Sequence, residues 1–244
     1  MSPMNAVIRR ELQGYFSTPI AYVFIVIFLI LSGVFAFYLG GLYERNQADL
    51  APFFGFHPWL YLFLVPAVSM RIWSEERRSG NIELLMTLPV SQKDLVLGKF
   101  FSSWIFVGIA LFLTFPIWIS ISYLGEPDNG MIFASYIGSF LLAGAFLAIG
   151  SCISVASKNQ VIAFILTAVI CFVFLLAGLP LVLDFFSSWM PQFMVDTIAS
   201  TSFLSHFGSI NKGVLDLADL VYFVMVISLW LYATSVLLDI KKAD

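Results

Sequence analysis

Long apolar stretches alternate with short polar segments along this chain. A helix needs about 20 apolar residues to cross a hydrocarbon core of ~30 Å, because each residue adds ~1.5 Å. Six stretches approach or exceed that length. The pattern therefore predicts an all-α integral membrane protein, a single domain over residues 1–244, with six transmembrane helices. Their expected ranges are about 19–43, 58–73, 100–124, 131–156, 160–183 and 219–239.

The composition also indicates that most of this chain lies in a lipid membrane. Of its 244 residues 60% are hydrophobic and only 11% are charged, against roughly 25% charged in a soluble domain. The basic residues form no long run, so nucleic acid is not an expected partner, whereas membrane lipid is. Cys152 and Cys171 lie within apolar runs, without a CxxC spacing, and we expect them to be buried small side chains.

The distribution of Lys and Arg predicts the orientation, since cytoplasmic flanks of spans carry the excess of positive charge. With both termini in the cytoplasm, only Arg45 and Lys212 face outward. The cytoplasmic side then holds the other ten basic residues: Arg9, Arg10, Arg71, Arg77, Arg78, Lys93, Lys99, Lys158, Lys241 and Lys242. The opposite topology would invert this bias.

The segment 3–17 before the first span has helical periodicity, with Met4, Ile8, Leu12 and Tyr15 on one face. The pattern indicates an amphipathic helix lying on the inner leaflet, and a short charged anchor is the alternative. The charged positions that we expect to face away from the apolar side are Arg9, Arg10 and Glu11.

A second polar segment, residues 74–99, lies between the second and third spans. Ser79–Gly80 interrupts the helix, Pro89 stops a short apolar stretch, and Ser91 with Asp94 resembles a capping box. We name this segment the elbow. A solvated loop would not need the apolar side chains of the elbow, so they dock on a partner or on the bundle itself. These side chains are Ile82, Leu84, Leu85 and Met86.

The outer segment, residues 184–217, carries an aromatic stripe interrupted at Pro191. Such a stripe suits a helix lying in the outer leaflet, or a re-entrant hairpin whose backbone is buried against protein. Both remain open. The two histidines, His57 and His206, fall on this outer side, and we expect packing roles for them.

The sequence shows no pattern of an ion-coupling, catalytic or nucleotide-binding site. No ionisable residue lies near the centre of a span, which argues against an ion-coupled transporter. No base matches the depth of a serine nucleophile. Gly98–Lys99 is followed by Phe100 and lacks the glycines of a phosphate loop. We therefore expect neither an enzyme nor a bound cofactor, and instead a subunit driven from outside.

The stretch 75–100 resembles the pattern of ABC type-2 export permeases. Further segments, 9–24, 58–76 and 206–223, are most similar to the gliding-motility-type permease subunits. The positions of the elbow that match the family pattern are Glu76, Gly80, Glu83, Leu84, Leu85, Pro89, Ser91, Gly98 and Lys99.

The resemblance implies that the elbow docks on a separate ABC ATPase subunit, with Glu76 and Glu83 as charged contacts and Gly80 to Pro89 as the coupling segment. It implies a second contact at Ser157, Lys158 and Asn159.

The same resemblance implies a working unit of two ATPase copies and a second permease copy or homologue in a bacterial inner membrane. ATP and Mg²⁺ would bind to the ATPase. Export is the implied activity, with lipids, lipid-linked sugars, peptides and amphipathic drugs equally compatible as substrates. A scaffold that transmits ATP-driven motion to a periplasmic partner is the alternative.

Overall fold

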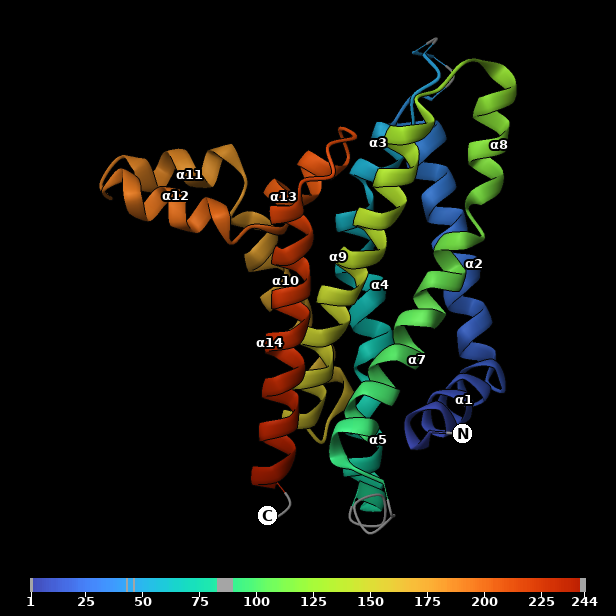
Figure 1. Cartoon of the computed structure of the whole chain (residues 1–244), viewed down its shortest axis with the longest axis vertical. Coiled ribbons are helices and arrows are strands. Elements are labelled where there is room, and N and C mark those ends of the chain that lie inside the picture. The colour runs from blue at the N-terminus through green and yellow to red at the C-terminus, as the bar shows by residue number, and fades with distance from the viewer. Residues whose placement is uncertain (1, 43, 46, 83–89, 242–244) are drawn as a thin grey trace.

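The computed structural model describes residues 2–42, 44, 45, 47–82 and 90–241, and within these ranges the regular elements are all helices. The long helices run side by side along the vertical axis of Figure 1. Both ends of the described chain lie at the bottom of that view. We call this the lower end and the opposite one, which carries α3 and α13, the upper end.

The first two helices form an L at the lower end. Helix α1 (Pro3–Phe16) lies across the bundle (Figure 1). The chain turns at Ser17 and Thr18, and Pro19 starts α2, where its fixed φ suits the first helical position. Helix α2 (Pro19–Val34) continues as a π-helix, η1 (Phe35–Leu39), so the first apolar helix ends before residue 43.

The region expected as the second span is divided. After the short α3 (Ala51–Gly55), α4 (His57–Ser69) contains Pro66 and ends at Met70, and α5 (Arg71–Ser79) follows with a polar composition. Proline removes an N–H from the helical ladder and favours such interruptions.

Two later apolar stretches each form two helices, one of them with a sharp bend. Helix α7 (Gln92–Phe112) is followed by α8 (Phe115–Leu124), and α10 (Gln160–Leu176) by α11 (Pro180–Ser187), which bends away by 70°. Helices α11 and α12 (Gln192–Ser200) project sideways from the bundle (Figure 1). The remaining helices are α9 (Asn129–Ala156), α13 (Phe203–Ile210) and α14 (Leu217–Lys241).

By length and apolar composition, four described helical segments can cross a membrane, or five if the bent α10–α11 pair is one span. An all-helical membrane protein is therefore supported. The expected second span, 58–73, falls on α4, which has only 13 residues, and on the charged α5. The four segments are Pro19–Leu39, Gln92–Leu124, Asn129–Ala156 and Leu217–Lys241.

Helix α9 is the centre of the bundle and contacts α4, α7, α10 and α14. Small residues allow this close approach: a Cβ at Gly144 would lie 2.8 Å from Trp104, and one at Gly150 would overlap Ser69. Cys152 and Cys171 are buried free thiols, as expected.

We expect Gly150→Ala to lower the free energy of unfolding by about 1–3 kcal/mol, because the new Cβ would overlap both Cβ and Oγ of Ser69 on α4. Detergent-driven unfolding followed by circular dichroism measures this. Gly208→Ala is the matched control, since a Cβ at Gly208 meets nothing within 4 Å. Equal stability of the two variants would contradict the tight α9–α4 contact.

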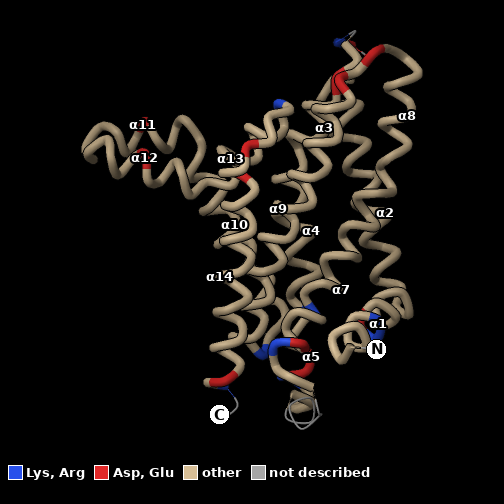
Figure 2. The backbone as a smooth tube through the Cα atoms, in the orientation of Figure 1, with Lys and Arg blue, Asp and Glu red and all other residues tan. Residues whose placement is uncertain are grey.

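The charged residues gather at the two ends (Figure 2). Of the described basic residues, only Arg45, between η1 and α3, and Lys212, just after α13, belong to segments of the upper end. At that end His206 does more than pack, because its Nδ1 lies 2.6 Å from Asp219 Oδ1. His57 is fully buried, with Nδ1 2.7 Å from Ser139 Oγ.

Candidate functional site

A buried lysine organises the lower end. Lys99 lies at the start of the third turn of α7. The first turn of this helix is fixed by Ser91, whose hydroxyl accepts from the Asp94 N–H at 3.1 Å and donates to the Asp94 carboxylate at 2.6 Å. This confirms the expected cap. The Lys99 side chain is only 2% exposed. A buried ammonium needs counter-charges and acceptors.

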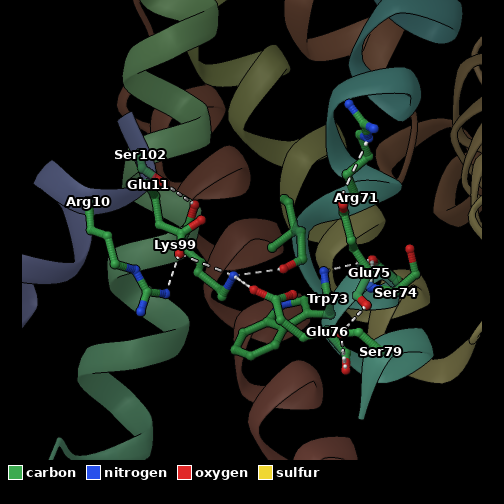
Figure 3. Close-up of polar contacts among 12 residues, drawn as sticks. Arg10, Glu11, Arg71, Trp73, Ser74, Glu75, Glu76, Ser79, Lys99 and Ser102 are labelled. Atoms are coloured by element: carbon green, nitrogen blue, oxygen red, sulfur yellow. Dashed lines mark hydrogen bonds and ion pairs between the residues drawn. The ribbon is translucent and has the colours of Figure 1, made fainter. Parts of the chain in front are cut away.

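The Lys99 ammonium finds three acceptors, which match its three N–H donors. Its Nζ lies 3.3 Å from Glu11 Oε1 and 3.0 Å from the Ile72 carbonyl oxygen, and it donates to Glu76 Oε1 (Figure 3). The Trp73 ring lies 5.2 Å from Nζ and adds a cation–π contact. We call Glu11, Glu76 and Lys99 the Lys99 triad. It joins α1, α5 and α7.

Further contacts hold α1 against α7. The Tyr15 hydroxyl lies 2.9 Å from Ser103 Oγ, and its ring stacks on Phe106 at 5.1 Å. Burial raises the pKa of Tyr15 to about 12, so it stays neutral. The Val7 side chain occupies the space beside Gly98, where a Cβ would lie 2.7 Å away. Helix α1 is therefore anchored on the bundle and does not lie on lipid alone.

The break between α4 and α5 is capped by a residue of α9. Ser154 Oγ accepts from the backbone N–H groups of Trp73 and Ser74, at 3.1 and 3.0 Å, and donates to the Met70 carbonyl at 2.9 Å. The three bonds fasten the start of α5 to α9. The Trp73 indole also donates to Ser151 at 3.0 Å. Helix α5 is thus fixed to α9 on one side and to Lys99 on the other.

The second expected contact segment lies at the same end. Arg77 of α5 donates to the Val155 carbonyl near the end of α9. The turn that follows contains Ser157 and Lys158, and the Asn159 side chain caps α10 by accepting from the Val161 N–H at 2.9 Å. The end of α5 and the 157–159 turn are therefore close neighbours.

The structure shows the environment of several predicted site residues. Gly80 ends α5 in the left-handed region, with φ of 73°, which favours glycine. Glu76, expected as a contact for a partner, has an internal partner in Lys99. Arg9 is exposed, and Arg10 bonds Glu11 at 2.7 Å. The remaining elbow positions, Glu83, Leu84, Leu85 and Pro89, lie outside the described residues.

Glu11 corrects an expectation, because it faces the bundle and not the polar side of α1. Burial raises the pKa of this carboxyl, but the Lys99 ammonium and the Arg10 guanidinium outweigh that effect and hold it below the ordinary value of 4.5. A depressed pKa means that Glu11 stabilises the fold at neutral pH. This contribution is lost as pH falls below 4.5 through the folded-state pKa.

We therefore expect Glu11→Gln to be less stable than the unaltered protein at neutral pH, with the difference shrinking as pH falls from about 7 to about 3. Unfolding curves at several pH values measure the difference. A difference that stays constant with pH would show that Glu11 carries no charge-dependent link to Lys99.

Two features of this site escaped the sequence analysis. Lys99 was counted as a flanking positive charge and as a position of the family pattern, and its separation of 23 positions from Glu76 gives no sign that the two side chains pair. Nothing in the sequence distinguishes Ser154 from the other serines of the chain. The clue available was the motif itself: Glu76 and Lys99 are both positions of the family pattern.

Comparison with known families gives one match. The family model described as "ABC-2 family transporter protein" matches residues 47–238, which run from just before α3 into α14. Two members of the Lys99 triad, Glu76 and Lys99, lie within the matched range, and Glu11 lies before it. No curated protein matches the chain.

Proposed function

Because the chain belongs to the ABC-2 family of transporter proteins, we propose that it is the permease subunit of an ABC type-2 transporter, driven by a separate ATPase. In this family the membrane component is not itself catalytic, and ATP hydrolysis lies in partner subunits. The family match over most of the chain is the observation that carries the proposal. We further propose that the chain belongs to the gliding-motility-type subgroup of these permeases. It then has six spans, one of which consists of α4 and α5 together.

In this proposal the lower end faces the cytoplasm. Two basic residues at the upper end stand against nine described ones at the lower end, and cytoplasmic flanks carry such an excess. Both termini are then cytoplasmic, in a bacterial inner membrane. The nine are Arg9, Arg10, Arg71, Arg77, Arg78, Lys93, Lys99, Lys158 and Lys241.

The docking surface consists of the elbow beyond Gly80 and the turn of Ser157, Lys158 and Asn159. Two observations support it. Helix α5 ends at Gly80, an exposed glycine in the left-handed region at the lower end of the bundle. Arg77 binds the Val155 carbonyl and keeps the two segments adjacent. One partner surface can therefore contact both.

The Lys99 triad would carry motion from the docking surface into the membrane. ATP binding closes two ATPase copies and draws the elbows of two permease copies together. Helix α5 moves with the elbow, and Lys99 and Glu11 couple it to α7 and α1. The first, second and fifth spans then shift between two packed states, as a bistable element biased by a partner's ligand does.

Reconstitution in vesicles tests the function. The chain is combined with the candidate ATPase and with labelled lipids, lipid-linked sugars, peptides or amphipathic drugs. Hydrolysis that requires the chain, with export of one substrate class, is the expected result. Stimulated hydrolysis without flux favours the alternative, a scaffold that drives a periplasmic machine. Hydrolysis that is independent of the chain contradicts both.

A further inference from the structure

Two cavities adjoin at the corner where α1, α2, α4 and α5 meet. One is polar, with a volume of about 360 Å³, and its lining includes Glu75, Glu76 and Asn81. The other is apolar, with a volume of about 220 Å³. Tyr15, Thr18 and Arg71 line both. The pair is a continuous site that is charged at one end and apolar at the other.

Two charged side chains that line the polar cavity, Arg71 and Glu76, each carry a buried atom that makes no hydrogen bond among the described residues. Arg71 Nε is buried without a hydrogen bond, since its nearest carboxylate oxygen, Glu75 Oε2, is 3.7 Å away. Glu76 Oε2 is likewise buried and unbonded, because its other oxygen serves Lys99 (Figure 3). Unsatisfied buried polar atoms are costly and uncommon. A ligand with an anionic acceptor beside a cationic donor would satisfy both.

The apolar cavity is a groove between α2 and α4. Leu64 and Val68 form its α4 side. On the α2 side Val23 and Ile27 are 55% and 41% exposed, so the groove opens on the surface that faces lipid. It begins at Thr18 and Arg71, where α1 turns into α2 and α4 gives way to α5. Polar contacts lie below that level and apolar ones above it, as at a membrane surface.

From this arrangement we propose that the corner holds one phospholipid with a primary-amine headgroup. Its phosphate binds the Arg71 guanidinium, which is suited to bidentate phosphate contacts. Its ammonium donates to Glu76 Oε2 and Glu75. One acyl chain occupies the groove between α2 and α4. A choline headgroup has no N–H to donate, and a glycerol headgroup has no cation for the carboxylates. The site requires a membrane but no ATPase.

Native mass spectrometry tests the proposal on the full chain. The protein is released from nanodiscs that contain equal amounts of phosphatidylethanolamine, phosphatidylglycerol and phosphatidylcholine. We expect one retained lipid per chain, with phosphatidylethanolamine enriched about tenfold. Arg71→Gln should reduce retention of all three about tenfold, because the phosphate contact is common to them. Arg78→Gln, an exposed arginine on the same helix, is the matched control and should retain lipid normally.

A second variant examines the opposite end of the site. Ala67→Phe fills the groove without touching the polar cavity and should also abolish retention. Circular dichroism and monodisperse elution check that each variant is folded. Equal retention of the three lipids, preference for phosphatidylglycerol, or normal retention by a folded Arg71→Gln or Ala67→Phe variant would overturn the proposal.

Discussion

Replacing Lys99 with methionine is expected to lower the free energy of unfolding by about 3–5 kcal/mol, the cost of breaking a buried ion pair from one side. The ammonium is almost fully buried and satisfies Glu11, Glu76 and the Ile72 carbonyl at once. Methionine fills similar space but leaves Glu76 without its cation and Glu11 with Arg10 alone. Detergent-driven unfolding of the purified protein at neutral pH measures the loss.

Lys93→Met is the matched control, since Lys93 is an exposed lysine on the same helix and its loss should cost within about 0.5 kcal/mol. A triple variant, Lys99→Met with Glu11→Gln and Glu76→Gln, should recover much of the stability, because no unpaired charge remains. If Lys99→Met is as stable as Lys93→Met, the triad does not hold α1, α5 and α7 together.

The second large effect is expected at the elbow. Leu84→Asp should abolish stimulation of the partner ATPase while the chain still inserts and folds. Apolar anchors at the centre of protein interfaces cost about 2–4 kcal/mol when lost, which corresponds to a fall in affinity of about 30-fold or more. Charge reversal at Glu83 should weaken docking in the same direction. ATP hydrolysis by the reconstituted complex, together with co-purification, measures both.

The control for the elbow is the same substitution at the opposite end, Leu215→Asp. Leu215 is 44% exposed in the segment between α13 and α14. This variant should leave hydrolysis and co-purification unchanged. If Leu84→Asp behaves like Leu215→Asp, the ATPase docks elsewhere on the lower end.

The sequence could predict features that follow from local pattern. Helix α9 follows from an uninterrupted apolar stretch, which predicts a span over 131–156 where the helix runs from Asn129 to Ala156. The cap at Ser91 follows from the spacing to Asp94. These features depend on residues within a turn or two of one another. Hydropathy and helix geometry therefore suffice to find them.

Features that depend on partners distant along the chain were missed. Lys99 is buried only because Glu11 and Glu76 approach it from two other helices. The α4–α5 break at Met70 is stable only because Ser154 of α9 satisfies its backbone groups. An apolar stretch likewise does not reveal where it bends, so the expected span 160–183 did not anticipate the 70° bend between α10 and α11.

Photo-crosslinking in the assembled complex tests the central claim that this bundle is driven through its lower end. A photoreactive amino acid is placed at Leu84, at Lys158 or, as an upper-end control, at Asn129. Crosslinks from Leu84 and Lys158 to one ATP-binding protein, and none from Asn129, are predicted. Absence of an ATP-binding partner at the first two positions, or its appearance at Asn129, would contradict the account.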